Sequence, residues 1–261
     1  MAEPFKLKRI PTLKTPGAFR EHVASLGLDL PCDDAILPRA ESPLSKPLDR
    51  ITLGGKTPSN RIAIHPMEGW DGTTSGGVTD EMTRRWQRFG ESGAKLILGG
   101  EAMAVRPDGR ANPNQLILNE ENQAEIASLR DTLVAAHAGR YGSTDDLAIG
   151  FQLTHSGRFC RPNDKVRLEP RIAYHHPLLD EKFGIDPDDD SVVWTDDELH
   201  RLVDSYLDAA RLAHKVGFRF VDVKACHGYL LHEFLSARSR SGPFGGDFEG
   251  RTRLLKTIIA R

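Results

Sequence analysis

The sequence predicts an α/β fold built on a parallel sheet. Four short apolar segments have the length and composition of buried strands, and each is followed by a segment with helical character. This alternation is typical of βα units, in which the helix returns the chain so that the next strand runs parallel to the last. Near-continuously apolar strands are expected where helices cover both faces of a sheet. In chain order the segments are NRIAIHPM (60–67), AKLILGG (94–100), DLAIGFQL (146–153) and FRFVDVK (218–224).

Residues 1–45 differ from the rest of the chain because they are rich in proline and in mixed charge. Their helical candidate is short and lies around Phe19–Leu26. We expect an N-terminal extension packed on a body formed by residues 46–261. That body opens with RITLGGKT (50–57), whose alternation around a Gly-Gly pair predicts a hairpin. Its last residues resemble a phosphate-binding loop, but that motif requires glycine where Arg50 stands, and we reject it.

The helical segments have identifiable starts and apolar faces. Thr79 is the expected N-cap of the helix in TDEMTRRWQRFGES, and residues 119–138 carry the longest amphipathic pattern. Thr195 is expected to cap a helix that stops at Gly217, and another helix begins near residue 247. The side chains predicted to face the core are Ile126, Leu129, Leu133 and Val134 in one helix, and Leu199, Leu202, Val203, Tyr206, Ala209 and Ala213 in another.

One connection is much longer than the others. Residues 155–194 form an acidic, proline-rich excursion, which makes them a candidate for a loop that covers a site. The pair His175 and His176 lies inside it. We expect this pair either to gate a substrate or to be solvated on the surface.

Composition limits the classes of partner. The formal net charge is −2, from 35 Lys and Arg against 37 Asp and Glu, which gives no basic field for nucleic acid or anionic lipid. No apolar stretch approaches the length that spans a bilayer. The cysteines Cys32, Cys160 and Cys226 are far apart, which argues against disulfides, zinc and iron–sulfur clusters. We therefore expect a cytoplasmic protein without a metal, whose partners are small molecules or proteins.

The arrangement of polar residues favours a barrel over a doubly wound sheet. No G-x-G-x-x-G motif follows any of the four strands, which lowers the doubly wound alternative. Chemically capable side chains instead recur just after the strands, as they do at the carboxyl-terminal face of a (β/α) barrel. These residues are Glu68, Glu101, Gln152, His155, Lys224, His227 and Tyr229.

Four motifs resemble, in order and spacing, the strand-end motifs of the Old Yellow Enzyme family of FMN-dependent NAD(P)H oxidoreductases. They are NRIAIHPMEG, GGEAMAVRPDGR, GFQLTHSGR and FVDVKACHGYLLHEFLSARSRSGPFGGDFEGRTR. The resemblance covers residues 46–261 and implies the N-terminal half, about four βα units, of an FMN-binding (β/α)₈ barrel of the TIM type. In the family, later strands supply an arginine near the flavin pyrimidine and the loops for the FMN phosphate. No segment of this chain is assigned to those roles.

The resemblance implies five cofactor-binding residues. Pro66 and Met67 would run along the flavin edge, and Ala102 would be the small residue close to the ring. Gln152 would pair its amide with the pyrimidine edge, or else cap a neighbouring loop. Glu68 stands where relatives often place threonine or cysteine. It is expected either to lie protonated beside the ring or to turn outward to a backbone amide or a basic partner.

The resemblance also implies three catalytic residues in the segment KACHGY. Lys224 and His227 map onto the pair of donors that grips a substrate carbonyl oxygen, and Tyr229 maps onto the proton donor to the α-carbon. Lys224 departs from the usual histidine. Because Asp222 is predicted to point to the same side of the strand, the alternative is an Asp222–Lys224 ion pair. His155 and Arg158 are expected either to shape the flavin pocket or to stabilise their loop.

Two hypotheses follow for function. The first is an FMN-dependent oxidoreductase that passes hydride from NAD(P)H through the flavin to an activated alkene, such as an α,β-unsaturated carbonyl. The second is a non-catalytic half-barrel that requires self-association or a complementary chain, because its first and last parallel strands have free edges.

Overall fold

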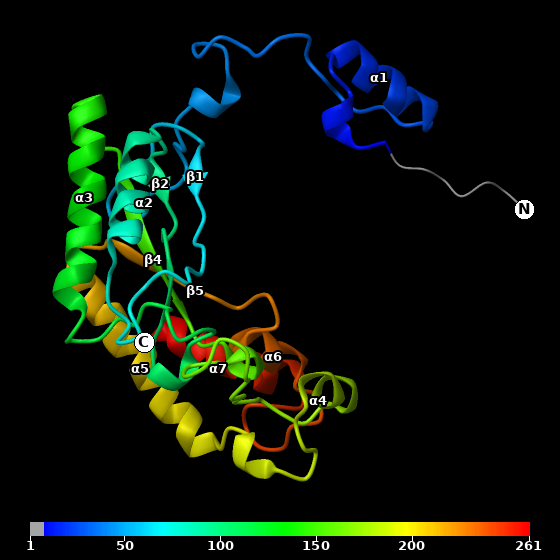
Figure 1. Ribbon diagram of the computed structural model, residues 1–261, viewed down its shortest axis with the longest axis vertical. Helices are drawn as coiled ribbons and strands as arrows, with labels where there is room; N and C mark the ends of the chain where they lie inside the picture. Colours follow the sequence, from blue (N-terminus) through cyan, green and yellow to red (C-terminus); the bar gives the residue numbers. More distant parts are fainter. Residues whose placement is uncertain (1–7) are drawn as a thin grey trace, which may run out of the picture. The chain divides into compact units, whose positions relative to one another are not determined.

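The computed structural model describes residues 8–261 (Figure 1). The chain divides into two compact units, residues 1–45 and 46–261. The described part of the first unit contains one α-helix and two 3₁₀ turns, which are α1 (Pro16–Ser25), η1 (Ile10–Thr12) and η2 (Pro43–Ser45).

Helix α1 begins three residues before the predicted Phe19. The Thr15 hydroxyl accepts the Ala18 amide at 3.1 Å, and Pro16 occupies the first helical position. Proline suits that position because its fixed φ is already helical and its missing N–H would have no partner there. The N-cap and proline therefore set the start of the helix before its apolar residues do.

The second unit contains a sheet in which every pairing is parallel, as predicted. Strand β1 pairs with β2, both β2 and β3 pair with one edge of β4, and β5 pairs with the other edge. The strands are β1 (Ala63–Ile64), β2 (Leu96–Ile97), β3 (Ala102–Ala104), β4 (Ala148–Thr154) and β5 (Phe220–Val223).

The second predicted strand is broken into β2 and β3. Ile97 pairs with Ile149 and Ala102 pairs with Gln152, so the four residues 98–101 lie opposite only two residues of β4. Gly99 lies in this bulge with φ of 143°, and a Cβ there would come within 2.5 Å of the Gln152 backbone nitrogen. The bulge therefore requires glycine at position 99. It interrupts the pairing with β4, which resumes in β3 beside the carboxyl end of β4.

The hairpin predicted in residues 50–57 is confirmed as a tight turn. Leu53 and Lys56 form an antiparallel bridge, and both central residues, Gly54 and Gly55, have positive φ. Two positive φ values define a type I′ turn, which suits two-residue hairpins.

The four helices predicted in the second unit form as α2, α3, α5 and α7, whereas the short helices α4 and α6 were not predicted. Helices α2 and α3 lie side by side (Figure 1), and the predicted caps Thr79 and Thr195 are present, the latter in a capping box with Glu198. The helices are α2 (Asp80–Glu91), α3 (Gln123–Tyr141), α4 (Pro177–Phe183), α5 (Asp196–Lys215), α6 (Leu230–Ser236) and α7 (Phe248–Ala260). The 3₁₀ turns are η3 (Pro107–Gly109), η4 (Gly157–Phe159) and η5 (Asp190–Val192).

The core lies between the sheet and these helices. The six predicted residues of α5 are all buried, as are Ile126, Leu129 and Leu133 of α3, whereas Val134 is half-buried. Trp86 of α2 packs on Phe151 and Phe218, with ring centroids 6.1 Å from each. Among residues 8–261, none of the helices combines the length and apolar character that crossing a bilayer requires.

Candidate functional site

The sheet places two of the five predicted cofactor residues, Ala102 and Gln152, in one row near the carboxyl ends of the parallel strands. Ala102 pairs with Gln152, and Gln152 pairs in turn with Asp222. Next to this row, the Ala102 amide donates to the Met67 carbonyl at 3.3 Å. Residues in register on parallel strands point to the same face of the sheet, so these three strand residues share one surface.

The Gln152 side chain is held by its neighbour in the row. Its amide nitrogen donates to the Asp222 carboxylate at 2.5 Å. Within residues 8–261, the Gln152 amide oxygen has no hydrogen-bond donor. Asp222 therefore fixes which way the amide points and leaves its acceptor available.

Tyr229 and Lys224 meet Glu68 at the ends of β5 and β1. The Tyr229 hydroxyl donates to Glu68 Oε2 at 2.7 Å, and Lys224 Nζ lies 3.9 Å from the same oxygen. Lys224 Nζ also lies 3.9 Å from the centre of the Tyr229 ring. The ion pair considered between Lys224 and Asp222 is therefore wrong, because the lysine turns to Glu68 while Asp222 takes the Gln152 amide.

Burial raises the pKa values of the two acidic groups in this cluster, Glu68 and Tyr229. It raises the pKa of Glu68 above its ordinary value, against the opposing effects of the Tyr229 hydrogen bond and the Lys224, Arg161 and His227 charges. Burial and the Glu68 carboxylate raise the pKa of Tyr229 as well. A buried carboxyl with a raised pKa and a phenol that stays protonated are suited to hold and pass protons.

His227 lies differently from Lys224. It is exposed, has φ of 60°, and its Nδ1 lies 3.6 Å from the Cys226 sulfur. A positive φ is uncommon for residues other than glycine, and here it forms a turn with Gly228, whose φ is 75°. The exposed histidine is still close enough to Glu68 for its charge to lower the Glu68 pKa.

The segment after β1 is partly open. Pro66 is half-buried, whereas the Met67 side chain is 70% exposed. Nearby, the Arg161 guanidinium lies 5.0 Å from the centre of the Trp70 ring. This leaves apolar and aromatic surface beside the Glu68 cluster.

A second acidic cluster supports the same segment. Glu101 is 2% exposed, accepts the Gly69 amide at 3.2 Å and pairs with Arg85, which also pairs with Asp71. Burial raises the pKa of Glu101 to about 7, although Arg85 favours its charged form. The position of Glu101 after a strand was visible in the sequence, but no pattern there linked it to Arg85 on helix α2.

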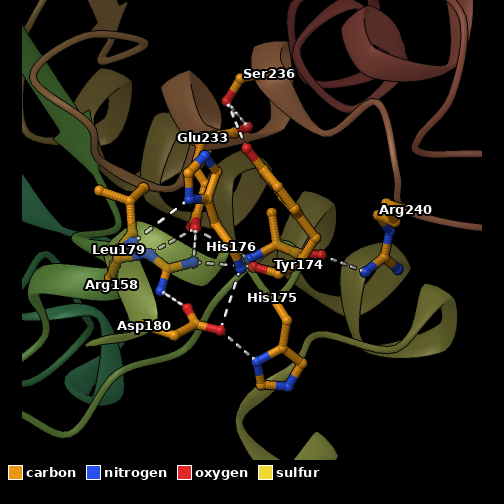
Figure 2. Close-up of polar contacts among 10 residues, drawn as sticks. Arg158, Tyr174, His175, His176, Leu179, Asp180, Glu233, Ser236 and Arg240 are labelled. Carbon is orange, nitrogen blue, oxygen red and sulfur yellow. Dashed lines mark hydrogen bonds and ion pairs between the residues drawn. The ribbon is translucent and has the colours of Figure 1, made fainter. Parts of the chain in front are cut away.

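A buried ionic network joins the long excursion to helix α6 (Figure 2). The Arg158 guanidinium donates to Glu233 Oε1 at 2.6 and 2.9 Å, pairs with Asp180, and donates to the Tyr174 carbonyl at 2.9 Å. Asp180 also accepts His175 Nδ1 at 2.7 Å. Arg158 thus links the excursion to α6, which is the loop-stabilising role considered for it. The pairing of His175 with Asp180 shows that it is not simply a solvated surface residue.

His155 is wholly buried at the end of β4. Its Nδ1 accepts the Gly157 amide at 3.1 Å, which assigns the remaining ring proton to Nε2. Burial lowers the pKa of His155 to about 4. The side chain therefore acts as a neutral support for the turn after β4.

The described residues contain no group of His, Cys, Asp or Glu arranged to hold a metal ion. The chemistry of the cluster is that of hydrogen-bond donors and acceptors: an ammonium, a phenol, a carboxyl and an amide. Such a set can hold a polarised carbonyl and move a proton.

Comparison with known sequences assigns most of the chain. Residues 45–261 match the model of the NADH:flavin oxidoreductase / NADH oxidase family. An NADPH dehydrogenase of Bacillus pumilus is 31% identical over 214 residues, covering 80% of this chain and 57% of the relative. An NADPH dehydrogenase of Clostridium acetobutylicum is 27% identical over 216 residues, covering 82% of this chain and 58% of the relative. The chain thus spans less than three fifths of the length of these relatives.

Solved structures show the same partial coverage. Old Yellow Enzyme from Pichia superposes with a TM-score of 0.66 at 24% identity, covering 85% of this chain and 56% of that one. The Old Yellow Enzyme homologue from Zymomonas mobilis superposes with a TM-score of 0.65 at 27% identity, covering 84% of this chain and 59% of that one. The predicted fold, about half of an α/β barrel, is therefore confirmed.

Proposed function

Because the chain belongs to the NADH:flavin oxidoreductase / NADH oxidase family, we propose that it is an FMN-dependent oxidoreductase that delivers hydride from NAD(P)H to an activated alkene. An α,β-unsaturated carbonyl is the proposed acceptor. The observation that carries this proposal is the meeting of Tyr229 and Lys224 beside Glu68 at the strand ends.

The chemistry of the row suits the ring of FMN, the cofactor that the family implies. Ala102 is small and buried, and the Gln152 amide oxygen can accept from a ring N–H because no donor in residues 8–261 occupies it. The backbone of Pro66 and Met67 lies at the neighbouring strand end. When bound, FMN would supply the hydride chemistry, and the protein would supply binding, orientation and protons.

Each polar residue has a proposed task toward the substrate. Lys224 and His227 would donate hydrogen bonds to the carbonyl oxygen, which gains negative charge as hydride reaches the β-carbon. Tyr229 would give its proton to the α-carbon, since its phenol is protonated at neutral pH.

The test is flavin retention followed by two separate half-reactions. The purified chain is incubated with FMN, freed of excess cofactor, and examined for bound-flavin absorbance. It is then reduced with NADH or NADPH and mixed anaerobically with an α,β-unsaturated ketone. We expect reoxidation by the ketone, slowed about 10²-fold or more in Tyr229→Phe. A folded chain that retains no flavin would refute the proposal for this chain.

A second candidate is the non-catalytic half-barrel that requires self-association or a complementary chain, and the ends of the sheet support it. Among the described strands, β1 pairs only with β2 and β5 pairs only with β4, which leaves each with a free edge. Free parallel edges favour pairing with another chain. Sedimentation velocity of the folded protein tests this candidate: a concentration-dependent dimer supports it, and a strict monomer refutes it.

A further inference from the structure

We propose that Glu68 is the proton reservoir of the reaction, passing its own proton to Tyr229 as Tyr229 protonates the substrate. This inference rests on the proposed function and deepens it. It assigns to Glu68, which replaces the threonine or cysteine expected from the resemblance, a part in proton delivery.

The hydrogen bond between the two residues carries the argument. With Glu68 ionised, the single phenolic proton of Tyr229 is engaged on Glu68 Oε2 at 2.7 Å. A phenol held in this way has no proton to direct at a substrate carbon. With Glu68 protonated, the bond reverses: the carboxyl donates to the phenolic oxygen, and the phenolic proton becomes free to point into the site.

The surroundings of Glu68 make the protonated form accessible. The side chain is 14% exposed, and burial raises its pKa. The groups facing it are Lys224, His227 and Tyr229 from the end of β5, and Arg161 from the segment after η4; all four favour the ionised form. The balance between burial and these partners allows Glu68 to gain and lose a proton.

On the other side, the adjoining Gly69 amide is held by Glu101, which is paired with Arg85. This second carboxyl bonds to the backbone of the Glu68 segment. It therefore holds that segment in place while Glu68 exchanges its proton with Tyr229.

The step balances in protons and electrons. When bound, the reduced cofactor would supply hydride to the β-carbon, and the electron pair of the alkene would pass to the α-carbon and oxygen as an enolate. The Tyr229 O–H bond breaks as the α-carbon C–H bond forms, and the Glu68 O–H bond breaks as the phenol O–H bond re-forms. The resulting Glu68 carboxylate lies 3.9 Å from Lys224 Nζ, which stabilises it until solvent returns a proton.

The first test needs no cofactor. Infrared difference spectra between the wild-type protein and Glu68→Gln isolate the protonated-carboxyl band of Glu68. Because burial raises the Glu68 pKa, we expect this band to persist to a higher pH than the bands of exposed carboxyls, and to shift in Tyr229→Phe, which lacks the phenolic partner. Absence of the band across the range where the protein is folded would overturn the inference.

The second test follows reoxidation of the reduced enzyme by an unsaturated ketone as a function of pH. In the wild-type protein the rate should fall about tenfold or more as pH rises through the value at which the Glu68 band disappears. In Glu68→Gln, which keeps a donor to the phenol but has no transferable proton, that fall should be absent and the rate low throughout. An unchanged profile in Glu68→Gln would overturn the inference.

The two tests separate the inference from the proposed function. Failure to bind flavin, or to be reduced by NAD(P)H, refutes the function, and the infrared band still decides whether Glu68 holds the proton. If NAD(P)H reduces the bound flavin normally and the pH profile of reoxidation is the same in Glu68→Gln as in the wild-type protein, only the inference about Glu68 is refuted.

Discussion

The amide nitrogen of Gln152 donates to the carboxylate of Asp222 at 2.5 Å, across two adjacent parallel strands. This contact orients the Gln152 side chain and leaves its oxygen as an acceptor on the row that includes Ala102. Asp222 therefore acts on the proposed flavin site through Gln152.

We predict that Gln152→Leu lowers FMN affinity about tenfold, which corresponds to the loss of about one hydrogen bond. Thr154→Val is the matched control. Thr154 lies on the same strand and is buried, and its hydroxyl has no hydrogen-bond partner among the described residues. Titration of flavin fluorescence measures both variants; equal affinities would contradict a contact between Gln152 and the flavin.

Arg158 should be essential for stability. We predict that Arg158→Leu lowers the free energy of unfolding by about 3–5 kcal/mol, because Asp180 and Glu233 would remain buried without their cation. The same substitution at Arg167 is the control. Arg167 forms a 3.2 Å ion pair with Glu169 at the surface, and 73% of the Arg167 side chain is exposed. The free energy of unfolding should therefore fall by less than about 1 kcal/mol in this control. Urea denaturation compares them, and similar losses would contradict the prediction.

The His155 imidazole should make the protein sensitive to acid. Its pKa is about 4 in the folded protein against 6.5 ordinarily, so the unfolded chain binds a proton more readily. The stabilisation is complete above about pH 6.5 and is lost as pH falls toward about 4, amounting to about 3 kcal/mol. In His155→Asn, whose oxygen can accept the Gly157 amide without titrating, this part of the pH dependence should disappear. Denaturant unfolding across this pH range provides the measurement. The prediction would be contradicted if the free energy of unfolding depended on pH equally steeply in His155→Asn and in the wild-type protein.

Two helical glycines should respond to alanine with opposite signs. At Gly90 of α2, a Cβ would come within 2.3 Å of the Leu133 carbonyl oxygen of α3, so Gly90→Ala should destabilise by about 1–3 kcal/mol. At Gly139 of α3 nothing lies within 4 Å, so Gly139→Ala should stabilise by about 0.5–1 kcal/mol. Thermal melting compares them, and the same sign for both would contradict the close approach of α2 and α3.

The sequence by itself indicated the parallel strands, the long helices and the helix faces that are buried. Interactions between residues close in the chain are enough for this. The side chains of Thr79 and Thr195 cap helices, and the spacing of apolar residues in α5 selects the face that packs on the sheet. The order of four strand-end motifs was also enough to indicate the family and a partial barrel. The proposed roles of Lys224, His227 and Tyr229 remain predictions from that resemblance.

The tertiary structure decided which partner each polar side chain takes. Alternation along a strand put Asp222 and Lys224 on one face, but Asp222 bonds to Gln152 on β4 and Lys224 turns to Glu68 at the end of β1. Likewise, the break between β2 and β3 follows from the register that both make with β4. Sequence periodicity fixes only the face on which a residue lies. The partner depends on distances between strands that are far apart in the chain, and these distances are set only when the sheet and its helices pack.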